Sequence, residues 1–187
     1  MKTWITGCMF LLAVLNAGAQ QKKRPGITPD HLKLQYAGSI GFISVGAGYE
    51  WAKKKIHSDL YYGYSPAGVS GVDIHSVTGK FTWKPFSKTL DNDVQLDLLT
   101  TGLLVNYAFG SRYHLFSRTK YSFVYYGFPT AAHINFFVGG GISKKRTGLY
   151  YELGITDRDL VSYANNTRTI GFLEIVNIGI GARYRLR

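Results

Sequence analysis

Alternation of apolar and polar residues is the feature that most restricts the folds open to this chain. Before Arg187, every second residue is apolar, and asparagine, glycine and arginine stand between: Val176, Ile178, Ile180, Ala182, Tyr184 and Leu186 against Asn177, Gly179, Gly181, Arg183 and Arg185. A period of two places the two sets on opposite faces of a β-strand. Similar alternation covers most of the chain after residue 33, and aromatic residues make up 15% of the sequence. Because aromatic residues favour strands, we expect an all-β protein.

The pattern predicts seven strands and leaves an eighth open. The seven cover about residues 34–51, 56–64, 72–85, 94–109, 132–143, 149–155 and 176–186. Basic turns at Lys53–Lys55 and Lys144–Arg146 separate two strand pairs, and residues 87–93 are expected to form a loop. Residues 110–131 could hold the eighth strand or form one long loop. Several strands change phase midway, which indicates bulges.

The first nineteen residues have the layout of a secretory signal peptide. Lys2 is followed by an apolar run from Cys8 to Leu15 and by Ala17-Gly18-Ala19, a small-residue cleavage site. The run is too short for a transmembrane helix. Acylation of Cys8, as in a lipoprotein, fits less well because this cysteine precedes most of the apolar run. Cleavage would remove 19 of 187 residues and leave 168 without cysteine, which excludes disulfides.

We therefore expect three segments. Residues 1–19 form the signal peptide, and residues 20–32 form a flexible, basic lead-in broken by Pro25 and Pro29. Residues 33–187 form one barrel domain, because no internal repeat, low-complexity tract or change of composition divides them.

The strongly basic character of the chain restricts its partners. The formal net charge is +11 and the isoelectric point about 9.7. Nucleic acid would be one partner of such a chain, but export argues against it. The basic clusters at Lys22–Arg24, Lys53–Lys55 and Lys144–Arg146 suit the phosphates of anionic lipids or lipopolysaccharide better.

Alternation alone does not say which face of a barrel points outward. In a soluble, lipocalin-like barrel the apolar face lines the interior, whereas in a membrane barrel it contacts lipid. Charges and glycines gather on the face opposite the apolar one, including Asp59, Asp73, Lys80, Glu152 and Arg183. Aromatic residues gather near strand ends, as in interfacial girdles: Tyr49, Trp51, Tyr62, Tyr64, Trp83, Phe86 and Tyr184. We therefore expect the apolar face to contact lipid.

The segment "GIGARYRL" resembles the C-terminal signal of bacterial outer-membrane proteins. Gly181, Tyr184 and Leu186 fit that pattern, whereas Gly179 and the terminal Arg187 differ from it. In length and alternation, the chain resembles the small eight-stranded outer-membrane β-barrel proteins. The resemblance implies an antiparallel up-and-down barrel of eight strands, whose last strand pairs with its first and is recognised by the barrel-assembly machinery.

Catalysis by a lipid-modifying outer-membrane enzyme is the first alternative. Such an enzyme would need a nucleophile, a base and an acid in contact, and the segment Asp73-Ile74-His75-Ser76 offers these residue types. On a strand, however, Ser76 points away from Asp73 and His75. The His-x-Ser-Asn signature of lipid A deacylases is absent, and its nearest counterpart, Ser162–Asn166, lacks the histidine. We therefore expect no catalytic site.

Neither a cofactor nor a metal site is expected. The chain has five histidines, at positions 31, 57, 75, 114 and 133. His57, Asp59, His75 and His133 could meet across strands, but their spacing does not demand a metal ion. We expect His57, Asp59, Asp73 and His75 to form hydrogen bonds in the lumen instead. Gly139–Gly141 lacks the continuation of a phosphate-binding loop.

The sequence thus favours a barrel of the cell outer membrane with a structural role or a binding role through its loops. A continuous pore is not expected, because eight strands leave room mainly for side chains. A lipid-modifying enzyme and a soluble periplasmic ligand-binding barrel remain the alternatives. The ligand, the partner and the oligomeric state stay open.

Overall fold

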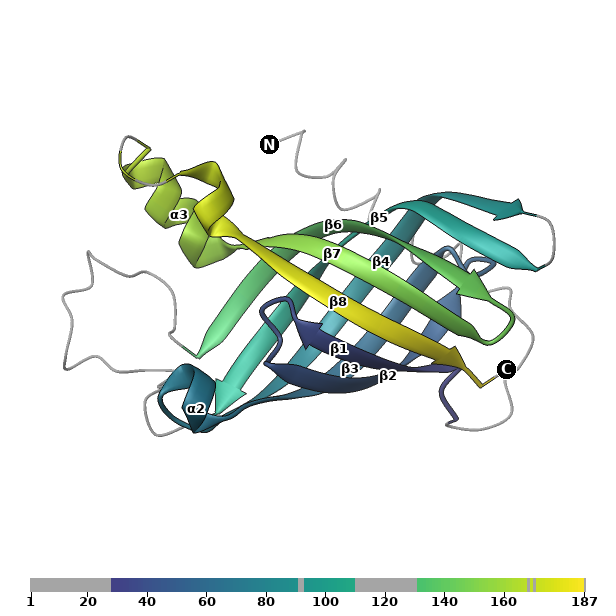
Figure 1. The fold of residues 1–187 in the computed structure, drawn as a ribbon, viewed down its shortest axis with the longest axis horizontal. Helices are drawn as coiled ribbons and strands as arrows, with labels where there is room; N and C mark the ends of the chain where they lie inside the picture. Colours follow the sequence, from purple (N-terminus) through teal and green to yellow (C-terminus); the bar gives the residue numbers. More distant parts are fainter. Residues whose placement is uncertain (1–27, 91–92, 110–130, 168, 170, 187) are drawn as a thin grey trace, which may run out of the picture.

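The chain folds into one closed antiparallel β-barrel of eight strands (Figure 1). The computed structural model describes residues 28–90, 93–109, 131–167, 169 and 171–186. The strands are β1 (His31–Ala37), β2 (Ile43–Trp51), β3 (Ile56–Ser65), β4 (Ile74–Leu90), β5 (Val94–Phe109), β6 (Ala132–Lys144), β7 (Thr147–Thr156) and β8 (Val176–Arg185). Each strand pairs with its neighbours in sequence, and β8 pairs with β1. The prediction of an all-β, eight-stranded barrel is confirmed.

The eighth strand comes from the region of residues 34–51, where the sequence predicted a single strand and the structure has two. The expected strand over residues 34–51 is wrong, because the chain reverses at residues 38–42 and gives β1 and β2. Gly38 and Gly41 have φ angles of 76° and 139°, which glycine adopts at little cost. The sheet also begins at His31, inside the expected lead-in. Residues 110–130, where the sequence left a strand open, lie outside the described residues.

Most other strand boundaries agree with the sequence pattern, and β5 has the predicted bounds. The predicted loop over residues 87–93 is wrong in part, because Ser87–Leu90 extend β4 and pair with β5. The register shifts between Trp83 and Ser87 in β4 and between Asp97 and Thr100 in β5, whereas the phase change in the strand predicted over residues 34–51 reflects the reversal at residues 38–42.

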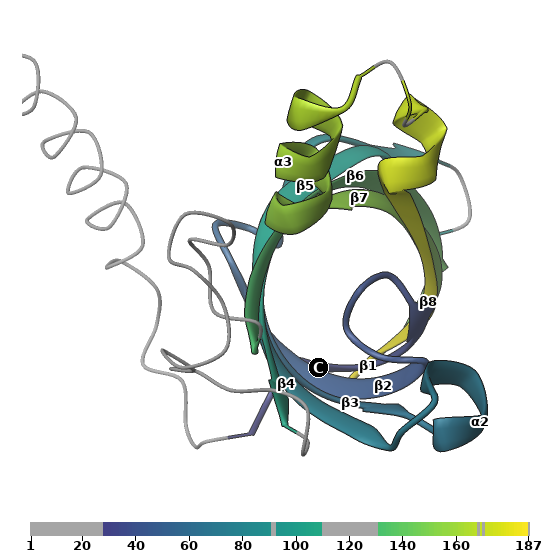
Figure 2. The same ribbon diagram turned by 90° about the vertical axis from the view of Figure 1, so that its left-hand side faces the viewer.

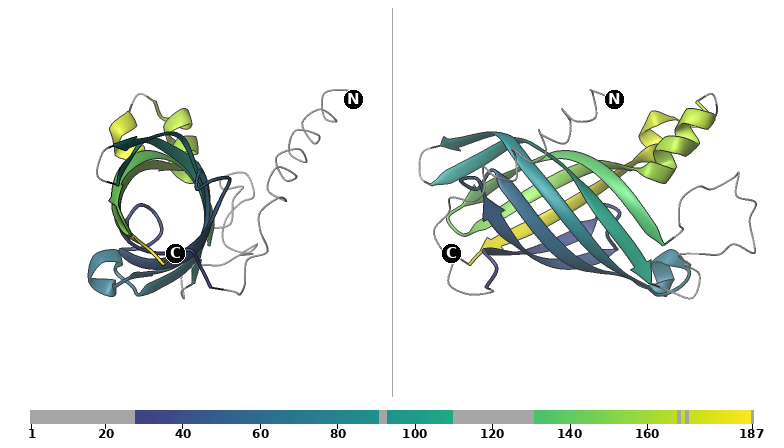
Figure 3. Two further views of the ribbon diagram at one scale, coloured as in Figure 1. Left: turned by 90° about the vertical axis from the view of Figure 1, so that its right-hand side faces the viewer. Right: turned by 180° about the vertical axis from the view of Figure 1, so that it is seen from behind.

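Short turns and longer connections separate to opposite ends of the barrel (Figures 1 and 3). The terminal end, as we name it, carries His31 of β1 beside Arg185 of β8 and the tight turns after β2 and β6. The loop end carries residues 38–42, helix α2 (Ala67–Ser70), helix α3 (Asp157–Asn165) and the 3-10 helix η1 (Phe172–Ile175). Thr156 caps the N-terminus of helix α3, because its hydroxyl oxygen accepts a hydrogen bond from the backbone N–H of Asp159 at 3.1 Å.

No helix in the described part of the chain has both the length and the apolar character that crossing a bilayer would require.

The two faces of the sheet differ as the alternation predicted. Large apolar side chains cover the outside at mid-height and stay exposed, among them Leu34, Val45, Leu60, Leu103, Val138 and Ile180. Polar and charged side chains point inward and are buried, among them Gln35, Asp59, Lys80, Asp97, Glu152 and Arg183. The protein thus has a polar core inside an apolar shell, the reverse of a soluble barrel.

Candidate functional site in the barrel lumen

An ion pair between opposite walls crosses the middle of the lumen. Nζ of Lys80 on β4 donates to Oε1 of Glu152 on β7 at 2.6 Å and to Oε1 of Gln35 on β1 at 3.1 Å. The hydroxyl of Tyr150 donates to the same Gln35 oxygen at 3.0 Å. The Lys80 ammonium also lies 4.7 Å from the ring centre of Phe137, within cation–π range. We call these residues, Gln35, Lys80, Tyr150 and Glu152, the central layer.

A second set of buried charges fills the lumen towards the terminal end. Asp59 accepts from Lys33 Nζ at 2.6 Å and contacts Nε2 of His31 at 2.5 Å. Lys84 donates to Asp97 at 2.6 Å. Each carboxylate is thereby neutralised by a nearby cation, which is what charges need in a space closed to water.

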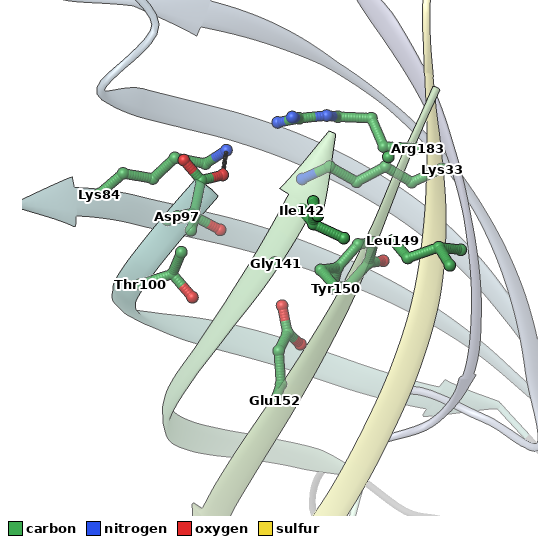
Figure 4. Close-up of a pocket in the computed structure, with 12 residues that line it drawn as sticks. Lys33, Lys84, Asp97, Thr100, Gly141, Ile142, Leu149, Tyr150, Glu152 and Arg183 are labelled. Atoms are coloured by element: carbon green, nitrogen blue, oxygen red, sulfur yellow. Dashed lines mark hydrogen bonds and ion pairs between the residues drawn. The ribbon is translucent and has the colours of Figure 1, made fainter. Parts of the chain in front are cut away.

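Little empty space remains between these two sets. Figure 4 shows Lys33 and Arg183 extending from one wall towards Lys84 and Asp97, with Tyr150 and Glu152 beside them. The cavity that they line measures about 30 Å³. A space of this size holds one or two water molecules but no larger solute, so the described side chains obstruct the lumen here.

The loop between β1 and β2 folds into the lumen at the loop end (Figure 2). Ile40 at its tip is fully buried and clusters with Tyr61, Leu104 and Phe137. Its carbonyl oxygen accepts hydrogen bonds from Ser76 Oγ at 2.7 Å and from Ser44 Oγ at 3.2 Å. Local backbone therefore fills this half of the lumen. We name residues 38–42 the inward loop.

A wider polar recess lies at the loop end, beside Ser39 of the inward loop. It measures about 240 Å³ and is lined by Ser39, Leu104, Asn106, His133, Asn135, Thr156, Arg158 and Asp159. Nδ1 of His133 lies 3.7 Å from Asp157, and Nε2 lies 3.5 Å from the Arg158 guanidinium. The recess has the volume of a small polar molecule, but it lacks the apolar lining that most ligand pockets have.

The residues considered for catalysis do not meet. His75 is exposed on the outer surface, where Nδ1 lies 2.7 Å from the Tyr62 hydroxyl. Asp73 lies in the connection after α2, also exposed, and accepts from the Tyr64 hydroxyl at 2.8 Å. Ser76 is buried on the inner face, so the expected opposition of Ser76 and His75 is confirmed. Placing Asp73 and His75 in the lumen was wrong, because Asp73 precedes the strand and His75 falls on its outward phase.

The other candidate residues lie in different parts of the structure. His57 and Asp59 do point into the lumen, as predicted, whereas His133 lies near the opposite end. Gly139–Gly141 belong to β6, as the strand pattern indicated. The segment Ser162–Asn166 forms the end of α3 and its cap. His114 and Lys22–Arg24 lie outside the described residues.

Sequence reasoning missed two parts of the lumen. It left His31 in the lead-in, although alternation in phase with Lys33 and Gln35 could have placed all three on one face. It also missed the inward loop, although the closely spaced Gly38 and Gly41 are a turn signal.

Comparisons of the chain with protein-family models, with curated proteins and with solved structures find no match.

Proposed function

We propose that this protein is an integral β-barrel of the cell outer membrane with an obstructed lumen, and that it serves a structural role or binds partners through its loop end. The observation that carries the proposal is the apolar outer band of a fully closed barrel. A shell of exposed Leu, Val, Ile and Phe side chains is unfavourable in water and favourable against hydrocarbon.

Aromatic side chains border this band at both ends, which supports the proposal. Tyr49, Trp51, Trp83 and Tyr184 lie on the outer face near the terminal end, and Tyr36, Tyr64, Tyr107 and Phe109 near the loop end. Tyrosine and tryptophan favour the level of lipid headgroups, because one end of the ring system is apolar and the other donates a hydrogen bond. Two such belts of aromatic residues, one near each end of the strands, are typical of a barrel that spans both headgroup layers.

The short basic turns suit the periplasmic side. Lys53–Lys55 and Lys144–Arg146 both lie at the terminal end, whereas the longer connections lie at the loop end. Outer-membrane barrels have short periplasmic turns and longer external loops. In this orientation the C-terminal strand is offered to the barrel-assembly machinery, and α3 and the polar recess face outward from the cell.

The two tryptophans that remain after signal cleavage allow a direct test. Trp51 and Trp83 are 38% and 49% exposed on the outer face, both near the terminal end. In vesicles of brominated phosphatidylcholine, we expect stronger quenching by bromine near the headgroup than by bromine near the chain end. Trp51→Phe and Trp83→Phe report each position separately. Protein that stays in detergent-free solution with unquenched tryptophan would contradict the proposal and favour a soluble barrel.

Three further measurements address the remaining alternatives. The washed outer-membrane fraction should yield a band that migrates faster before boiling than after it, as closed barrels do. In planar bilayers we expect no ion conductance, because the central layer obstructs the lumen. Mass spectrometry of lipid A from cells with and without the protein should show the same acyl chains, and altered acylation would favour the lipid-modifying alternative.

A further inference from the structure

Three neighbouring strands bring two histidines and a glutamate together inside the terminal end. His31 is the first residue of β1, and Glu50 on β2 is paired in register with His57 on β3. All three side chains point into the lumen and are buried. One nitrogen or oxygen atom from each lies within 4.8 Å of the others.

Gly48 leaves room for a contact between His31 of this cluster and Asp59. It stands between His31 and Asp59 in the sheet, paired in register with both. A Cβ atom at Gly48 would overlap the Asp59 carboxylate. Without that atom, His31 and Asp59 approach each other directly above the glycine, and Nε2 of His31 reaches Oδ1 of Asp59 at 2.5 Å.

A hydrogen bond fixes which nitrogen of the His31 ring carries a proton. Nε2 of His31 faces the Asp59 carboxylate, and Nε2 of His57 lies 3.2 Å from the carbonyl oxygen of Lys54. A carboxylate accepts hydrogen bonds, so His31 carries its proton on Nε2 when neutral. Nδ1 of His31 is then a bare lone pair, and it finds no hydrogen-bond partner among the described residues.

Both rings border the same carboxylate oxygen, because Nε2 of His57 lies 4.0 Å from Oε1 of Glu50. Nδ1 of His31 lies 3.6 Å from Oε1 of Glu50, too far for a hydrogen bond but suited to a shared cation. The rings of His31 and His57 are 5.0 Å apart, centre to centre. We propose that His31, Glu50 and His57 form a binding site for one divalent transition-metal ion of the Zn²⁺ type.

The chemistry of the donors and of their supports fits this ion. Two imidazole nitrogens and one carboxylate are a common protein ligand set for zinc, with the fourth position left to water. Ligand histidines in metal sites donate their other N–H to a carboxylate or a backbone carbonyl. Asp59 already occupies that supporting place for His31. Lys33 lies 2.6 Å from Asp59, and Arg185 lies 3.4 Å from Glu50, so each carboxylate also has a cation beside it.

The test uses the untagged mature chain, residues 20–187, folded in detergent and checked for its heat-dependent gel shift. Zn²⁺ is added, excess is removed by desalting, and retained metal is measured by mass spectrometry. We expect one zinc per chain. Co²⁺ in its place should give the visible absorption of a four-coordinate nitrogen and oxygen site.

Matched histidine variants assign the site. His31→Gln and His57→Gln should each abolish retention, whereas His75→Gln and His133→Gln should retain one zinc. Asp59→Asn should keep the ligands but weaken zinc affinity about 10- to 100-fold, as loss of a supporting hydrogen bond does. If one variant fails to fold, the other carries the assignment.

Three outcomes of the zinc measurements would overturn the proposal. The wild-type chain could retain no zinc, both lumen variants could retain it fully, or His75→Gln could lose it. Nitrogen-15 NMR of the metal-free protein adds a second readout. A His31 ring protonated on both nitrogens at neutral pH would show that a proton, shared between Asp59 and Glu50, takes the place proposed for the metal ion.

Discussion

The two halves of the lumen are filled in different ways. Towards the terminal end, charged side chains from strands far apart in sequence fill the space, as Lys33 and Asp59 do. Towards the loop end, the inward loop fills it with Ile40 and its backbone carbonyl. The stability of the terminal half depends on the pairing of each buried charge. The stability of the loop half depends on how closely the inward loop fits among the small residues around it. Substitutions should therefore destabilise the two halves for different reasons.

The largest effect is expected in the central layer. Lys80→Met leaves Glu152 as a buried carboxylate without its cation, which should lower the free energy of unfolding by about 3–5 kcal/mol. The double variant Lys80→Met, Glu152→Leu should recover most of that loss, because it removes both charges. Lys88→Met, an exposed lysine on the same strand, is the control. Urea unfolding in lipid vesicles, followed by tryptophan fluorescence, measures all three. Equal stability of the single and double variants would contradict the ion-pair account.

The next prediction compares a substitution in the outer apolar band with a substitution at the loop end. Leu60 is 63% exposed at mid-strand, and Leu173 is 84% exposed on η1. Leu60→Arg should lower the free energy of unfolding in a bilayer by about 2–4 kcal/mol, because it places a charge in hydrocarbon. Leu173→Arg should change it by less than about 0.5 kcal/mol. Similar values for the two variants would show that the band does not contact lipid.

The fit of the inward loop should be sensitive to a single methyl group. A Cβ atom at Gly63 would overlap the carbonyl oxygen of Ile40, whereas at Gly79 it would meet no atom within 4 Å. Gly63→Ala should therefore lower the free energy of unfolding by about 1–3 kcal/mol through displacement of the loop. Gly79→Ala should be neutral or slightly stabilising. A neutral Gly63→Ala would mean that the loop does not occupy the lumen in solution.

The smallest effect concerns the connection after α2. The Tyr64 hydroxyl and the Ala67 backbone N–H hold the pKa of Asp73 below its usual range. The stabilisation is therefore present above the unfolded pKa and is lost as pH falls through the folded one. Carbon-13 NMR should show Asp73 titrating lower than in Tyr64→Phe, and the protection of the Ala67 amide against exchange, relative to its intrinsic rate, should fall in acid. An unchanged Asp73 titration in Tyr64→Phe would remove this account.

The outer face was predictable from the sequence, but the partners inside the lumen were not. Alternation assigns Leu60 and Lys80 to their faces, because a strand has a fixed period of two. It gives no information on which residues meet across the lumen, since Lys80 and Glu152 are 72 residues apart on non-adjacent strands. His31 and Asp59 meet only because Gly48 lies between them, which requires the register of three strands.

The seam between β1 and β8 has a consequence for how the barrel assembles. The other seven strand pairs join strands that follow each other in the chain, whereas the seam joins His31 to Arg185. Contacts between distant parts of a chain carry the largest entropy of loop closure and form late. The bonds of Lys80 to Gln35 and Glu152 connect β4 with β1 and β7, so they need both sides of the seam in place. Closure and neutralisation of the lumen charges are therefore one cooperative event, and an open sheet would expose unpaired charges that oppose its entry into lipid.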